Sequence, residues 1–201
     1  MGFFNKPILG SDRVKALDSF RERALVALAE LEKGTKNPLE KALYSRMARN
    51  VEGTQIFFYP RKTLREKIFR TQGRVYASVV KGENVNVIKI YQKGKQRFII
   101  RDNYINMPSE HVFEGKKLSV DGIFTLAHEY AHFPKPALGK FAKANGISFE
   151  QAEELMADTL SAKLAVEMGY PKELIMQHFR GRELVYGKFP FRKMIWNAVN
   201  R

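Results

Sequence analysis

Two histidines and a glutamate near the middle of the chain have the types and spacing of a metal-dependent hydrolytic site. The sequence reads His128-Glu129-Tyr130-Ala131-His132, which places the histidines four residues apart. In a helix, residues at this spacing project from the same side, one turn above the other. Two imidazoles held in this way can bind one Zn²⁺, and the glutamate beside the first can reach a water in the open ligand position. The motif therefore predicts two zinc ligands and a general base.

The residues around the motif predict one buried helix. Asp121 to Phe133 read DGIFTLAHEYAHF, with apolar side chains at helical spacing, and Pro134 and Pro136 then end the helix. Imidazole and carboxyl groups inside so apolar a helix need partners. A metal ion is one explanation. A core helix whose histidines hydrogen-bond to backbone or to carboxylates is the alternative that this segment alone leaves open.

A second helix is predicted by the run FEQAEELMADTLSAKLAVEMGY, which carries two acids at Glu154 and Asp158. Ser148 with Gln151 fits a capping box at its start, and Gly169 is well placed to end it. The two acids are four apart and share a face. One carboxylate can complete a His₂Glu zinc site, and the other can accept a proton from the far nitrogen of a ligand histidine.

The other acids of this second helix, Glu150, Glu153 and Glu167, are interpreted as solvated surface residues.

The two motifs together resemble the gluzincin group of zinc metallopeptidases, in which HExxH is followed on a second helix by ExxxD. The resemblance covers Asp121 to Tyr170. It implies a compact zincin-like α+β fold and the following roles. The zinc ligands would be His128, His132 and Glu154. The general base would be Glu129, and the partner of a ligand histidine would be Asp158.

The same resemblance suggests a residue that stabilises the oxyanion. In some members a downstream His, Tyr or Arg has this role, which makes His178, Tyr170, Arg180 and Tyr186 candidates. We favour His178 as the catalytic candidate, although the sequence does not choose among the four.

Length and composition indicate one globular domain of 201 residues without cysteine, and therefore without disulfides or thiolate ligands. The N-terminus lacks the long apolar core of a secretory signal, and no segment approaches the length of a membrane span. We therefore expect a cytoplasmic or otherwise intracellular protein, with association with a virus particle left open. Its oligomeric state is not encoded.

The net charge of +14 is unevenly distributed. Residues 119–170 carry seven acidic and four basic side chains, whereas 51–118 carry fourteen basic and six acidic ones. The excess of basic side chains favours binding to nucleic acid or to an acidic partner. The alternative is that the charge only keeps the surface soluble. The most basic run is the first candidate for contact with nucleic acid, through Arg61, Lys62, Arg65, Lys67 and Arg70.

The N-terminal part is predicted to be helical. Apolar periodicity indicates a helix over 11–34 that Gly34 ends, and Pro38 opens a shorter helix over 38–50. We treat 1–50 as a helical segment packed on the metallopeptidase domain of 51–201, because no linker separates the two.

Strands are predicted between these helices and the histidine motif. Gln55 to Tyr59 forms a short strand, and Arg74–Val80, Asn84–Tyr91 and Gln96–Arg101 form an antiparallel meander. Asn103 to Met107 is expected to add an edge strand just before the motif helix. By the resemblance, such an edge holds an extended substrate through backbone pairing, and the substrate-binding candidates are Tyr104, Ile105 and Asn106.

Three functions remain after the sequence analysis. The first is a zinc metallopeptidase in which Glu129 takes a proton from the attacking water and passes it to the leaving amine. The second is a basic nucleic-acid-binding or particle-associated structural protein whose peptidase activity is lost or incidental. The third is a zinc hydrolase that attacks carbonyls other than peptides.

A C-terminal segment from Lys188, with Phe189, Phe191 and Trp196, is expected to fold back onto the core.

Overall fold

The structure is a computed structural model that describes residues 10–59, 78–80, 86–92, 95–101, 104–108, 112–132, 138–180 and 191–200. The chain divides into two compact units. The strand-containing unit comprises Met1–Asp18 and Gly53–Gly122, and the helical unit comprises Ser19–Glu52 and Ile123–Arg201. Most of the N-terminal helical segment therefore lies in the same unit as both candidate metal motifs.

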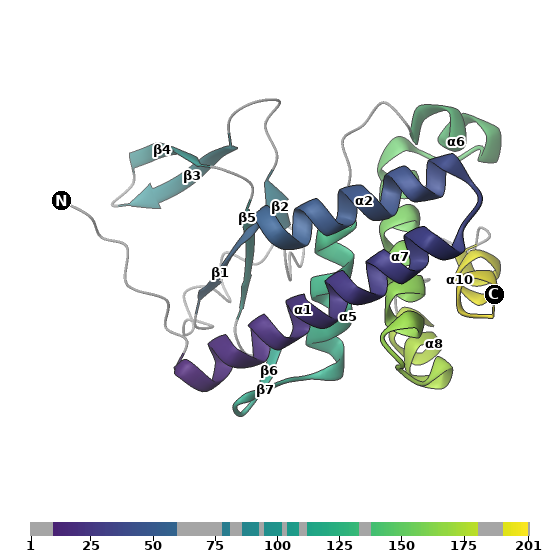
Figure 1. Ribbon diagram of the computed structural model, residues 1–201. Helices are drawn as coiled ribbons and strands as arrows, with labels where there is room; N and C mark the ends of the chain where they lie inside the picture. The colour runs from purple at the N-terminus through teal and green to yellow at the C-terminus, as the bar shows by residue number, and fades with distance from the viewer. Residues whose placement is uncertain are drawn as a thin grey trace. The chain divides into compact units, whose positions relative to one another are not determined.

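The strand-containing unit holds a mixed three-stranded sheet (Figure 1). Its order is β1 (Gln55–Tyr59), β5 (Tyr104–Pro108) and β2 (Ser78–Val80), with β1 parallel and β2 antiparallel to β5. The strand at Gln55 is confirmed. The edge position expected for the strand at Tyr104 is wrong, because β5 is paired on both sides.

The remaining strands form two hairpins. β3 (Asn86–Gln92) pairs antiparallel with β4 (Lys95–Arg101), and β6 (Phe113–Glu114) pairs with β7 (Lys117–Leu118). The β3–β4 hairpin confirms two strands of the expected meander. The remaining predicted strand, which ended at Val80, corresponds to β2 and pairs with β5 instead. Alternating hydrophobicity predicts a strand without specifying its partner.

The helix that carries the histidine motif, α5 (Val120–Tyr130), begins with a tight approach to the chain before it. The Ser119 hydroxyl accepts a hydrogen bond from the Gly122 amide at 2.9 Å, as an N-cap does. A Cβ atom at Gly122 would lie 2.2 Å from the backbone oxygen of Val112. Only glycine fits at this contact.

The helical unit contains most of α1 (Ser11–Gly34) and α2 (Pro38–Gly53), and then α6 (Leu138–Asn145), α7 (Phe149–Glu167), α8 (Lys172–Arg180) and α10 (Phe191–Val199). Helix α7 packs against α6, α8 and α10. Its buried face is made of small and aliphatic side chains, among them Ala152, Leu155, Leu160 and Leu164. The helices predicted over 11–34 and 38–50 are confirmed, and α6 is a helix that the sequence analysis did not identify.

Both ends of α7 are capped as expected. The Ser148 side chain accepts from the Gln151 amide, and the Gln151 side chain accepts from the Ser148 amide. At the other end, Gly169 has a φ of 83°, and its amide donates to the Val166 carbonyl while the Tyr170 amide donates to the Ala165 carbonyl. This pair of bonds is a Schellman motif, and glycine adopts its left-handed conformation without a steric penalty. The caps fix the length and position of the helix that carries both acids.

The C-terminal helix α10 packs on α7 and α8 through buried Phe191, Ile195 and Val199. Trp196, expected in this core, is 57 % exposed instead, because its position on α10 faces away from those three residues. Residues 188–190 lie outside the described part of the chain.

The α+β class is confirmed. Among the described residues, no helix has both the length and the apolar character needed to cross a membrane.

Candidate metal centre

The two histidines of the motif are held differently. His128 lies within α5, whereas His132 lies two residues beyond its last residue, Tyr130. After the helix ends, the hydrogen bonding tightens, and the His132 amide donates to the Glu129 carbonyl three residues back at 3.4 Å. The predicted helix extended to Phe133, and this prediction is wrong at its end, because α5 ends at Tyr130, before the second histidine. Phe133 and the prolines lie outside the described residues.

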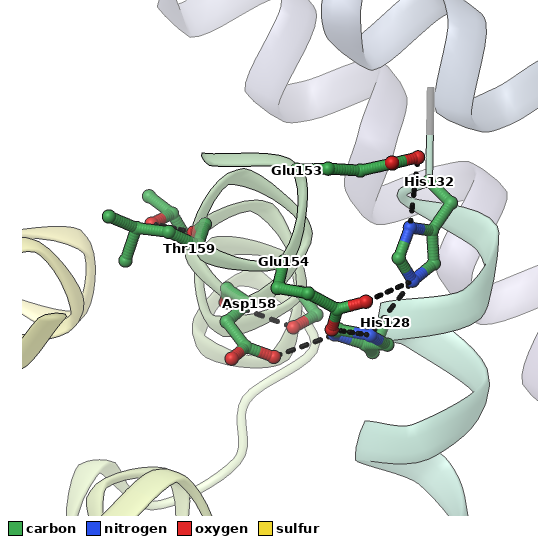
Figure 2. A network of polar contacts seen from close by, with 8 residues as sticks. His128, His132, Glu153, Glu154, Asp158 and Thr159 are labelled. Carbon is green, nitrogen blue, oxygen red and sulfur yellow. Dashed lines mark hydrogen bonds and ion pairs between the residues drawn. The ribbon is translucent and has the colours of Figure 1, made fainter. Parts of the chain in front are cut away.

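The ring nitrogens of both histidines nevertheless meet at one place, as Figure 2 shows. His128 Nε2 and His132 Nε2 are 2.9 Å apart. The Glu154 carboxylate, from α7, points between the two rings, with Oε2 3.2 Å from His128 Nε2 and Oε1 3.7 Å from His132 Nε2. The structure therefore brings together the three side chains that the sequence predicts as ligands.

These separations are close to those between the ligand atoms of one metal ion. For zinc bonds of about 2.0 to 2.2 Å, two ligand atoms of a tetrahedron lie about 3.3 to 3.6 Å apart. The three measured separations, 2.9, 3.2 and 3.7 Å, lie on both sides of that range. Because the two Glu154 distances involve different oxygens of one carboxylate, they show that this carboxylate is within reach of an ion bound by both imidazoles.

The hydrogen-bond chemistry of His128 is compatible with a metal ligand. Its Nδ1 lies 2.6 Å from Oδ1 of Asp158, a residue with no solvent exposure. A carboxylate at this position accepts the Nδ1 proton, which leaves a lone pair on Nε2. In that tautomer the Nε2 lone pair lies beside the Glu154 carboxylate and the Nε2 atom of His132, where a metal ion could be bound. The donor set therefore fits a divalent metal.

His132 has a carboxylate partner that the sequence analysis missed. Glu153 Oε1 lies 3.4 Å from His132 Nδ1, and the Glu153 side chain is 23 % exposed. The interpretation of Glu153 as an ordinary surface acid is wrong, because α7 approaches α5 so closely that two consecutive residues, Glu153 and Glu154, reach the same imidazole. Their adjacency in the sequence was the available signal, since a second ligand histidine also needs a partner on its far nitrogen.

The Glu129 carboxylate is buried beside the two histidines. It is 7 % exposed, and its Oε2 is buried without a hydrogen-bond partner among the described residues. One oxygen or ring nitrogen from each of His128, Glu129 and His132 lies within 4.8 Å of the others, so this group can hold a metal ion or a water bound to one. Leaving a buried carboxylate oxygen without a partner is unfavourable unless a ligand or water occupies the position beside it.

Tyr130, between the histidines, has a structural role. Its ring is buried and stacks on Phe20 of α1 with centroids 6.4 Å apart, and its hydroxyl accepts from Arg21 Nε at 3.3 Å. Burial raises the pKa of this hydroxyl above its ordinary value of 10.0, and the Arg21 guanidinium offsets part of the change. Helix α1 therefore holds the end of α5 through the Tyr130 side chain.

The oxyanion candidates take different positions. The His178 ring packs edge-on against Phe124, one turn before His128 on α5, with centroids 5.0 Å apart. Tyr170 also packs edge-on against Phe124, and the Arg23 guanidinium lies over the Tyr170 ring, 5.5 Å from its centroid. Arg180 is exposed, and Tyr186 lies outside the described residues. The role given to His178 stays a prediction.

The other predicted site residues belong to the strand-containing unit or lie outside the described residues. Tyr104, Ile105 and Asn106 form β5, where β1 and β2 already pair with both sides of their backbone. Substrate pairing along a free edge is therefore wrong for these three residues. The nucleic-acid candidates Arg61, Lys62, Arg65, Lys67 and Arg70 lie outside the described residues, so their role stays a prediction.

Comparisons with known proteins find no matching family model, no matching curated protein and no matching solved structure. Any functional assignment therefore depends on the residues and geometry of the site.

Proposed function

We propose that this protein is a zinc-dependent metallopeptidase of the gluzincin type, built on a zincin-like fold. The observation that carries the proposal is the approach of the Glu154 carboxylate to both Nε2 atoms, at 3.2 Å from His128 and 3.7 Å from His132. Two imidazoles and one carboxylate form the ligand set of a catalytic zinc site, which keeps its fourth position for water or substrate.

Each side chain has a distinct part in this proposal. His128, His132 and Glu154 would hold the zinc ion, which when bound acidifies water and polarises a peptide carbonyl. Glu129 accepts the proton of the attacking water at its buried carboxylate and delivers it to the nitrogen of the leaving amine. Asp158 accepts the proton on the far nitrogen of the His128 ring and so directs the Nε2 lone pair toward the centre, and Glu153 lies beside the far nitrogen of His132 at 3.4 Å.

The test combines metal analysis with a cleavage assay on unstructured peptides. The purified wild-type chain should contain one zinc per chain and lose cleavage on treatment with a chelator. Glu129→Gln should keep its zinc and lose about 10²- to 10⁴-fold in turnover, the usual contribution of a general base. Glu150→Gln is the matched control, because Glu150 is an exposed acid in the first turn of α7. Cleavage by Glu129→Gln at the wild-type rate would refute the assigned mechanism.

A zinc hydrolase that acts on other carbonyl compounds would have the same centre. The peptide assay separates the two, because such an enzyme would bind zinc and hydrolyse simple esters or amides while leaving all peptides intact.

The net charge of +14 supports a second candidate, a basic protein that binds nucleic acid and has lost its peptidase activity. This candidate predicts retention on DNA or RNA that weakens steeply with salt, because phosphate contacts release counterions. Retention of this kind without zinc-dependent cleavage of any peptide would favour it over the peptidase.

A further inference from the structure

An asparagine on α2 contacts the backbone at the point where α5 ends. Asn50 Nδ2 donates to the Tyr130 carbonyl at 2.8 Å and to the His132 carbonyl at 3.4 Å. The last carbonyl groups of a helix have no partner within it, and they need one when they are buried. Tyr130 is fully buried, so the Asn50 amide supplies a hydrogen bond that water does not.

The contact requires the amide group specifically. Both acceptors are carbonyl oxygens, so only a side chain with two N–H donors can serve them together. An aspartate has the same size but would place an oxygen against two oxygens. A leucine would fill the same space without any donor.

We propose that Asn50 is a positioning residue that sets the location of His132 in the metal centre. This inference rests on the proposed function, because it assumes that His132 binds the metal. His132 lies beyond the last helical residue, where one long amide bond to Glu129 takes the place of regular helical bonding. The Asn50 amide fixes the two carbonyls on either side of Ala131 and thereby the backbone from which the imidazole projects.

The geometry of the ligands makes this backbone position important. His128 has a rigid setting, because it lies inside α5 and is bound at 2.6 Å to a buried aspartate. His132 has a looser one, since its partner Glu153 lies at 3.4 Å and is partly exposed. Metal sites require their ligands within about 0.5 Å of the productive geometry. A backbone anchor compensates for the weaker side-chain contact.

The experiment compares Asn50→Asp with Asn145→Asp. Asn145 makes a similar contact elsewhere, because its amide donates to the Phe141 carbonyl at 2.8 Å near the end of α6. Three quantities are measured for each: the zinc dissociation constant by competition with a chelator, the visible absorption spectrum of the cobalt-substituted protein, and the thermal midpoint of the metal-free protein. The spectrum reports coordination geometry, which a purely structural role would leave unchanged.

The expected result is a selective effect on the metal. Asn50→Asp should weaken zinc binding by about 10- to 100-fold, as the loss of outer partners of metal ligands does. It should also change the cobalt spectrum, whereas Asn145→Asp should lower only the thermal midpoint. Asn50→Ser keeps one donor and should give a smaller loss of affinity, and it replaces the aspartate variant if that variant does not fold.

The outcomes separate this inference from the proposed function. If the wild-type protein binds zinc, and the Asn50 variants bind it with the wild-type affinity and spectrum, the inference is wrong and the metal centre stands. If the wild-type protein binds no zinc, the proposed function itself fails, and the positioning role with it.

Discussion

Replacement of Asp158 should weaken the metal centre by an amount that follows from its contact with His128. The Asp158 carboxylate is fully buried, and its Oδ1 lies 2.6 Å from Nδ1 of the imidazole. A hydrogen bond to a charged group contributes about 1.5 to 3 kcal/mol, against about 0.5 to 1.5 kcal/mol for a neutral one. Asparagine keeps a neutral acceptor, so Asp158→Asn should lose about 1 to 1.5 kcal/mol, or roughly tenfold in zinc affinity.

A larger change should follow from removal of the acceptor. Asp158→Ala leaves the imidazole proton without a partner, and the full 1.5 to 3 kcal/mol corresponds to about 10- to 150-fold in affinity. The independently known effect of losing such partners, about 10- to 100-fold, agrees with this range. The zinc dissociation constant, measured by chelator competition, is the assay.

Thr159→Val provides the control for these variants. Its hydroxyl donates to the Leu155 carbonyl at 2.7 Å on the same helix and is directed away from the imidazoles (Figure 2). The control should bind zinc as the wild-type protein does. Unchanged affinity in Asp158→Asn and Asp158→Ala, or an equal loss in Thr159→Val, would refute the role assigned to the aspartate.

Three further predictions concern single residues. Glu153→Gln should reduce zinc affinity by less than tenfold, because its 3.4 Å contact is long and partly exposed, and a loss greater than that of the aspartate variants would contradict the geometry. Gly122→Ala should lower the free energy of unfolding by about 1 to 3 kcal/mol, because the new methyl group would meet the Val112 backbone. Gly139→Ala on α6 is the control in thermal unfolding and should be neutral or stabilising, because no atom lies within 4 Å of a Cβ at that position. Tyr130→Phe should reduce the loss of stability at alkaline pH. The raised pKa of the Tyr130 hydroxyl means that the folded state favours the neutral phenol, so its contribution to the free energy of unfolding is complete below the ordinary pKa of 10.0 and is lost as the pH rises through the higher pKa of the folded state. Denaturant unfolding across alkaline pH measures this, and an equal fall in stability for Tyr130→Phe and the wild-type protein would contradict it.

Local features of the fold could be predicted because they are encoded within a few residues. The Ser148 capping box, the glycine after α7 and the four-residue spacings of the ligands each depend on neighbours in the sequence. The same holds for the β3–β4 hairpin, whose strands are separated by only two residues in the sequence. Spacing alone also placed Glu154 and Asp158 on one helix face, and the structure brings that face to the histidines.

Long-range features could not be predicted in the same way. The central position of β5 depends on pairing with β1, almost fifty residues earlier, and hydrophobic alternation carries no information about such a partner. Asn50 reaches the end of α5 from α2, and nothing in its own neighbourhood marks it. The end of the helix at Tyr130 was also missed, because the motif reads as helical up to the prolines while the backbone already tightens after the first histidine.

In the proposed centre, one metal ion is shared by His128, His132 and Glu154. Anomalous diffraction from crystals of the zinc-loaded protein, collected on both sides of the zinc absorption edge, tests this most directly. We expect a single peak about 2.0 to 2.2 Å from the Nε2 atom of each histidine and from a carboxylate oxygen of Glu154. A peak elsewhere, or a Glu154 carboxylate turned away from the paired imidazoles, would contradict it.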